Sequence, residues 1–185
     1  MKTVTEVECK NWCKALHNPI IVSNSGQLVY ETAGAHAFAV AVPGPFLQRV
    51  GLCYSLLSFP SEDYFQGGML WLREWNIGAG GIERVGWKVM EQMRRGYGQS
   101  ASLENEPGHA FRSDEFVDAQ AFVLQAMAFE WDAFLIPSIS DYYIFISHSG
   151  TVHCIANEAS KLEELCSRLN RWGPRNELPF FLQRK

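Results

Sequence analysis

The prediction of the fold starts from the stretch DYYIFISHSGTVHCIAN, residues 141–157. Two apolar runs, residues 141–147 and 151–156, lie on either side of a short polar segment that ends at Gly150. A short polar connection that contains glycine is what a tight turn between antiparallel strands requires. The stretch therefore predicts a β-hairpin, with His148 in its turn.

A second hairpin is predicted nearer the N-terminus, because residues 19–31, PIIVSNSGQLVYE, repeat this pattern around Gly26. Three more runs have the composition of strands, at residues 35–43, 67–78 and 133–137. The last residues, 178–185, are expected to form a short edge strand or a docked end.

Apolar residues at steps of three and four predict five helices, at residues 9–16, 45–59, 82–95, 113–131 and 160–172. Ser113 is expected to cap the fourth helix, and Ser160 the fifth in a capping box with Glu163. The fourth helix is apolar on most sides, so we expect it to be central. Since hairpins are frequent and parallel crossovers few, the predicted fold class is α+β, with a mainly antiparallel sheet of five to seven strands and about five helices packed on it. A single domain is expected to cover residues 1–185.

Composition and charge argue against several classes of protein. The chain has 185 residues, of which 47% are hydrophobic and 19% charged, and its formal net charge is −4. Its basic clusters are too small to follow a phosphate backbone, so nucleic acid is not expected as a partner. No run reaches the roughly 18 apolar residues that a membrane span needs. Without a recognisable signal peptide, the chain is expected in the cytoplasm, with its five cysteines reduced.

The reactive side chains have no spacing that is typical of catalysis or metal binding. His153 and Cys154 are neighbours in a predicted strand, so they should point to opposite faces of the sheet. The sequence has neither the paired spacing of zinc ligands nor a G-x-S-x-G motif. In the cluster NIGAGGIERVG, residues 76–86, Glu83 stands where a dinucleotide fingerprint has its third glycine. We therefore predict no catalytic residue, no metal and no cofactor.

One chemical alternative stays open, because Cys53 or Cys154 could meet His36, His109 or His148 once the chain folds. The alternative function is therefore an enzyme or a small-molecule-binding protein. Its site would lie between the sheet and the central helix, with His109, His148 and nearby acids contributing.

The surface is expected to carry the function through charge and aromatic side chains. Acids gather in residues 104–118 and predict a negative patch suited to a basic partner. Residues 98–112 are expected to form a polar loop, in which His109 is the exposed titrating group. Aromatic residues cluster around the glycine-rich connection, and such side chains are favoured anchors in protein interfaces. The predicted binding residues are Glu104, Glu106, His109, Asp114, Glu115, Trp75, Trp87 and Tyr97.

The segment WDAFLIPSISDYYIFISHSGTVHCIAN, residues 131–157, resembles the end of small bacterial proteins of the toxin-immunity type. In those proteins a Trp-Asp-aromatic-Leu-Ile/Val-Pro strand leads to a DYY/F-I/V-F-I/V-S-H hairpin and a final helix. The resemblance covers about the last third of the chain. It implies a cytoplasmic α+β protein that binds and blocks a partner without catalysis of its own. We therefore expect a non-enzymatic binding protein, with a basic toxin domain as its partner.

Overall fold

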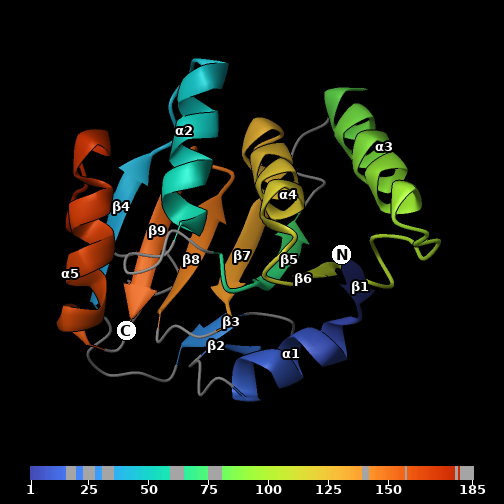
Figure 1. The fold of residues 1–185 in the computed structure, drawn as a ribbon, viewed down its shortest axis with the longest axis horizontal. Helices are drawn as coiled ribbons and strands as arrows, with labels where there is room; N and C mark the ends of the chain where they lie inside the picture. Colours follow the sequence, from blue (N-terminus) through green and yellow to red (C-terminus); the bar gives the residue numbers. More distant parts are fainter. Residues whose placement is uncertain are drawn as a thin grey trace.

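A seven-stranded antiparallel sheet forms the middle layer of the protein (Figure 1). The structure is a computed structural model that describes residues 1–15, 20–22, 28–30, 36–58, 65–74, 81–138, 142–156, 158–177 and 179. All paired strands in the sheet are antiparallel, which confirms the predicted α+β class. In spatial order the strands are β1 (Lys2–Val4), β6 (Gly108–Phe111), β5 (Gly68–Glu74), β7 (Asp132–Pro137), β8 (Tyr142–Ser147), β9 (Thr151–Ala156) and β4 (His36–Ala41).

The hairpin predicted from residues 141–157 is formed by β8 and β9. Ser147 pairs with Thr151 at the end of the ladder. Gly150 has a φ of 77°, which is the left-handed region that favours glycine in a tight turn. The second predicted hairpin is a separate two-stranded sheet of β2 (Ile20–Val22) and β3 (Leu28–Tyr30). The β8–β9 hairpin and the antiparallel pairing of β2 with β3 are therefore confirmed, whereas the expected turn at Gly26 lies outside the described residues.

Four helices cover one face of the large sheet in the order α5, α2, α4 and α3 (Figure 1). The two central helices, α2 and α4, pack against each other as well as on the sheet. A short 3₁₀ helix, η1 (Asn170–Trp172), follows α5 directly. The helices of this layer are α2 (Phe46–Leu57), α3 (Gly81–Gly96), α4 (Phe116–Ala128) and α5 (Ala159–Arg168).

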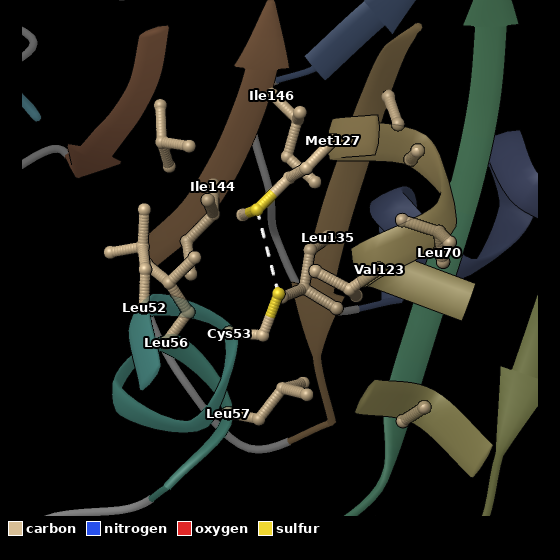
Figure 2. Close-up of a cluster of buried hydrophobic side chains, with 14 of the residues drawn as sticks. Leu52, Cys53, Leu56, Leu57, Leu70, Val123, Met127, Leu135, Ile144 and Ile146 are labelled. Carbon is tan, nitrogen blue, oxygen red and sulfur yellow. Dashed lines mark hydrogen bonds between the residues drawn. The ribbon is translucent and has the colours of Figure 1, made fainter. Parts of the chain in front are cut away.

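The main core lies between this helix layer and the sheet. Figure 2 shows side chains from α2 and α4 meeting side chains from the strands in one apolar cluster. At its centre the thiol of Cys53 on α2 lies 3.5 Å from the sulfur of Met127 on α4. Burial raises the pKa of the Cys53 thiol to about 12, so this cysteine is a packed, protonated side chain.

The opposite face of the sheet has a core of its own. The helix α1 (Glu6–Ala15) contributes Cys9 and Cys13, which are buried in one cluster with Trp71 and Phe134. Because side chains alternate along a strand, Cys154 lies in the core under the helix layer while its neighbour His153 faces the other way. The predicted opposition of these two residues is therefore confirmed.

Three details of the expected secondary structure are wrong. Residues 98–112 were expected to form a loop, but β6 lies inside this range and pairs with both β1 and β5. Ser113 does not cap α4, whose N-cap is Glu115. Ser160 and Glu163 form no capping box, because α5 begins earlier, with Glu158 as its N-cap. The tail at residues 180–185 lies outside the described residues.

Candidate functional site

The acidic residues predicted to bind a partner lie around the N-terminus of α4 and in the loop before β6. Glu104 is exposed in that loop, whereas Glu106 is half-buried. Glu106 shares a hydrogen bond with the hydroxyl of Thr3 and lies 4.0 Å from the buried guanidinium of Arg94. The charge of Glu106 is therefore directed into the fold as well as toward solvent.

The other two predicted acids are held by neighbouring groups. Asp114 forms an ion pair with Arg112 at 3.0 Å, and this hydrogen bond lowers the pKa of Asp114. Glu115 is buried and accepts hydrogen bonds from the backbone N–H of Arg112 and from the amino group of Met1. Burial alone would raise the pKa of Glu115, but these donors outweigh it and the pKa is lowered. Both carboxylates therefore serve local structure.

His109 is fully buried, so the expectation that it is the exposed titrating group is wrong. It lies on β6, and its ring packs on Phe122 of α4 with the ring centroids 4.9 Å apart. Burial and the nearby charge of Arg94 lower the pKa of His109 to about 3, so the ring is neutral at physiological pH. His109 does lie between the sheet and the central helix, as the alternative function supposes, but it is enclosed there.

The predicted aromatic anchors are only partly brought together. Trp75 lies outside the described residues, and Trp87 is half-buried against the main core. Tyr97 is 37% exposed and donates a hydrogen bond to Asp118 of α4. Burial and this bond raise the pKa of Tyr97 to about 12. The use of these aromatic residues and acids for binding stays a prediction.

The hairpin turn contains the clearest arrangement of potentially reactive groups. The buried carboxylate of Asp132 accepts a hydrogen bond from the backbone N–H of His148 at 2.7 Å. The same oxygen lies 2.9 Å from Nδ1 of the His148 ring. A carboxylate that orients an imidazole is a feature of many acid–base sites, but it is also a way to fix a turn.

A chain of side-chain hydrogen bonds leads away from this turn. It passes from Ser147 to Ser149 at 3.0 Å, from Ser149 to Thr151 at 3.0 Å, and from Thr151 to Nε2 of His153 at 3.1 Å. Within the described residues, no hydroxyl or thiol is hydrogen-bonded to the ring of His148. Because a serine nucleophile needs such a contact with its base, the turn is better explained as structure.

Sequence reasoning missed a set of exposed apolar side chains on the outer side of the two central helices. On α4 the outward positions 117, 121, 124 and 128 follow the helical repeat, and all four are apolar. Val117 is 73% exposed. On α2 the outward residues include Leu47, 81% exposed, and Tyr54, 51% exposed. We call Leu47, Tyr54, Val117, Ala121 and Leu124 the apolar helical face.

Contacts between α2 and α4 make this face continuous. The ring of Tyr54 meets Phe116 edge to face, with centroids 5.6 Å apart. Gln120 of α4 donates a hydrogen bond to the carbonyl of Val50 on α2 at 3.3 Å. On the other side, Gln125 of α4 donates to the carbonyl of Gly86 on α3. Hydrogen bonds and ring packing therefore hold the neighbouring helices side by side. Their outer apolar side chains are exposed on the same side of the layer.

The two central helices contain few charged residues. Arg49 is the one charged residue of α2, and its Nε donates to the carbonyl of Pro43. Asp118 is the one charged residue of α4, and it accepts the hydrogen bond from Tyr97. Exposed charges are found instead on the flanking helices α3 and α5. A centre poor in charged residues, with a polar rim, is the usual anatomy of a protein interface.

The sequence did contain a signal for this surface. The range 113–131 is apolar on most sides, which predicts a central helix, and α4 is indeed central in the helix layer (Figure 1). A helix that is apolar all round is either buried on all sides or left with an unpartnered face. The exposed fraction of Val117 identifies α4 as the second kind.

The described residues give no support to a metal site or a membrane span. No group of three or more His, Cys, Asp and Glu among the described residues could hold a metal ion. Of the helices described, none has the length and apolar character needed to cross a bilayer. No family model, curated protein or solved structure matches the chain.

Proposed function

We propose that this chain is a non-enzymatic binding protein that docks another protein on its apolar helical face. The observation that carries the proposal is the exposure of Leu47, Tyr54 and Val117 on two adjacent helices that contain only one charged residue each. Contiguous apolar patches of this kind are uncommon on monomeric proteins, and they typically mark interaction sites.

The apolar helical face supplies part of the free energy that a specific complex needs. Burying a large apolar side chain is worth about 1.5–3 kcal/mol, so the three most exposed side chains together supply several kcal/mol. Association costs roughly 4 kcal/mol or more in lost translational and rotational freedom. The partner must therefore also engage the surrounding residues, over about 800 Å² on each protein.

The resemblance of residues 131–157 to immunity-type proteins supports a toxin domain in the cytoplasm as the proposed partner. The sequence also predicts that acids in residues 104–118 attract a basic partner. Several of these acids have intramolecular partners, so we assign the main binding free energy to the apolar helical face. The exposed Glu104 and the neighbouring acids then act as part of the rim.

Site-specific photo-crosslinking in the producing cell tests the proposal. A photoreactive amino acid at position 47 or 117 should crosslink to one protein, whereas the same group at position 7 should not. Val7 is a matched control, because it is 65% exposed and apolar but lies on α1, away from the helix layer. The crosslinked protein is then purified and titrated with the wild-type chain and with Val117→Glu.

We expect the Val117→Glu variant to bind this partner at least roughly tenfold more weakly, because a buried charge at a docking surface must be desolvated. Equal crosslinking at positions 7, 47 and 117, or equal affinity of the two proteins, would refute the proposed function.

A further inference from the structure

The fold buries the charge of Arg94 without enough acceptors for its N–H groups. This residue lies in the last turn of α3, and its side chain is 1% exposed. Its Nη2 lies 3.5 Å from the carbonyl of Ser102 and 4.0 Å from a carboxylate oxygen of Glu106. Its other two nitrogens, Nε and Nη1, are buried and have no hydrogen-bond partner among the described residues. The N–H groups on these two nitrogens therefore lack an acceptor.

His109 adds unsatisfied nitrogens to the same part of the core. It lies opposite Thr3 in the pairing of β6 with β1, so the two side chains share one face of the sheet. The hydroxyl of Thr3 in turn shares a hydrogen bond with Glu106, the acid that approaches Arg94. The charge of Arg94 lowers the pKa of His109, and a smaller influence from the backbone of Leu70 acts in the opposite direction. Neither ring nitrogen of His109 makes a hydrogen bond of good geometry within the described part of the chain.

We propose that Arg94 and His109 bind one small monovalent anion, of the class of chloride or formate, in the interior of the protein. The anion accepts N–H groups of the guanidinium on one side and of the imidazole on the other. The site lies where α3 ends over the edge of the sheet formed by β1 and β6 (Figure 1). It takes no part in docking on the apolar helical face, so this inference is independent of the proposed function.

Charge balance favours an anion over a neutral ligand. Burial lowers the pKa of Arg94, and the carboxylates of Glu106 and Glu91 only partly offset this effect. Glu106 is half-buried and shares its carboxylate with Thr3, so it is an incomplete counterion. A buried cation without a close partner is strongly destabilising. An anion that accepts its N–H groups would remove much of that penalty, because hydrogen bonds between charged groups are the strong ones.

The surroundings of these nitrogens favour a small ligand with a single charge. The ring of His109 packs on Phe122, and both side chains are fully buried. Leu103, which follows Ser102 in the chain, is fully buried as well. An enclosed ligand must therefore have few atoms. The carboxylate of Glu106 would repel a second negative charge, and this repulsion is strong away from bulk water.

Urea unfolding of the full chain at constant ionic strength tests this inference. Sodium gluconate is replaced stepwise by sodium chloride or by sodium formate, because gluconate has the same charge but is too large for an enclosed site. An anion that binds only the folded chain stabilises it. Above the dissociation constant, each tenfold rise in chloride should therefore raise the free energy of unfolding by about 1.4 kcal/mol.

Three variants locate the effect. Arg94→Met should abolish the dependence on chloride, because methionine can fill the space of the side-chain stem but has no N–H group. Arg95→Met is the matched control, because Arg95 is the next residue of the same helix and is exposed, so its loss should leave the dependence unchanged. His109→Leu removes one donor to the anion and should weaken binding by roughly tenfold.

NMR spectroscopy of the wild-type chain keeps the test independent of how well the Arg94 variant folds. The Nε–H resonance of Arg94 should shift with chloride along a saturable curve. The dissociation constant from this curve should agree with the one from urea unfolding. Gluconate at the same ionic strength should leave the resonance in place.

Three results would overturn the anion site. One is an equal gain from chloride in the wild type and in Arg94→Met, and another is an Arg94 resonance that responds to neither chloride nor formate. The third is loss of the chloride dependence in Arg95→Met as well, which would place the effect on the surface. None of these results bears on crosslinking at positions 47 and 117, so failure of this inference is distinguishable from failure of the proposed function.

Discussion

The carboxylate of Asp132 holds both the backbone and the ring of His148. Its Oδ1 accepts the backbone N–H of His148 at 2.7 Å and lies 2.9 Å from the ring nitrogen Nδ1. Asp132 is the first residue of β7, and His148 follows β8, so one buried carboxylate joins the start of one strand to the turn after the next. This relationship accounts for both residues without a chemical step.

Asp132 should therefore matter more for stability than His148 does. We expect His148→Ala to change the free energy of unfolding by less than about 1 kcal/mol, because the ring is partly exposed. Asp132→Ala leaves the His148 N–H without its acceptor and should cost about 1–3 kcal/mol. Urea unfolding of both variants measures this difference. A larger loss for His148→Ala would show that the ring has a role beyond the turn.

Gly86 of α3 packs against Phe129 and Trp131, which follow α4. A Cβ at position 86 would lie 2.6 Å from ring atoms of Phe129 and 3.0 Å from Trp131. We expect Gly86→Ala to destabilise the fold by about 1–3 kcal/mol through overpacking. Gly96→Ala, at the end of the same helix, is the control, because no atom lies within 4 Å of its Cβ. Thermal unfolding that ranks the two variants in the opposite order would contradict the packing of α3.

Burial of His109 makes stability depend on pH in a predictable direction. Its pKa falls from 6.5 to about 3 on folding, because burial and Arg94 oppose the charged form. Between these values the unfolded chain binds a proton that the folded chain does not. The contribution of His109 to the free energy of unfolding is therefore fully present above about pH 6.5. It declines by up to about 1.4 kcal/mol per pH unit as the pH falls toward 3.

The variant His109→Leu removes this proton and isolates its effect from that of the carboxylates. The free energy of unfolding of the wild type minus that of the variant should be constant above about pH 6.5. It should fall as the pH is lowered. Urea titrations at several pH values measure it. A difference that stays constant down to pH 4 would mean that His109 is protonated inside the fold or is reached by solvent.

The apolar helical face should not be needed for folding. Val117→Glu replaces a side chain that is 73% exposed, so we expect the free energy of unfolding to change by no more than about 0.5 kcal/mol. Val123→Ala, in the same helix, removes a fully buried side chain and should cost about 1–3 kcal/mol. If Val117→Glu were as destabilising as Val123→Ala, the exposed valine would have to be explained by packing.

Local patterns in the sequence were sufficient to predict most of the fold. The β8–β9 hairpin could be predicted because two strands and their turn are contiguous, with Gly150 at the position that requires a positive φ. The strands β1 and β6 were missed because each has only three or four residues and is stabilised by pairing with distant segments. The expected caps at Ser113 and Ser160 are wrong because α4 begins after Ser113, with Glu115 as its N-cap, and α5 begins before Ser160, with Glu158 as its N-cap.

The candidate site was harder to predict than the fold. The strand β6 was not predicted, so His109 was assigned to a loop. A histidine in a loop is usually exposed, and this is why the sequence predicted an exposed ring. The apolar helical face was missed for a different reason. Periodicity shows that the range 113–131 is apolar all round, but only the packing of α2 and α3 beside α4 shows which side stays open to a partner.

Hydroxyl-radical footprinting in the producing cell reports whether another protein covers the apolar helical face. We predict that oxidation of Leu47 and Tyr54 in the cell is much lower than in the dilute purified chain. Val7, which is exposed on α1, should be oxidised equally in both samples. Equal oxidation of Leu47 and Tyr54 in the two samples would mean that no protein occupies this surface, and the account would be contradicted.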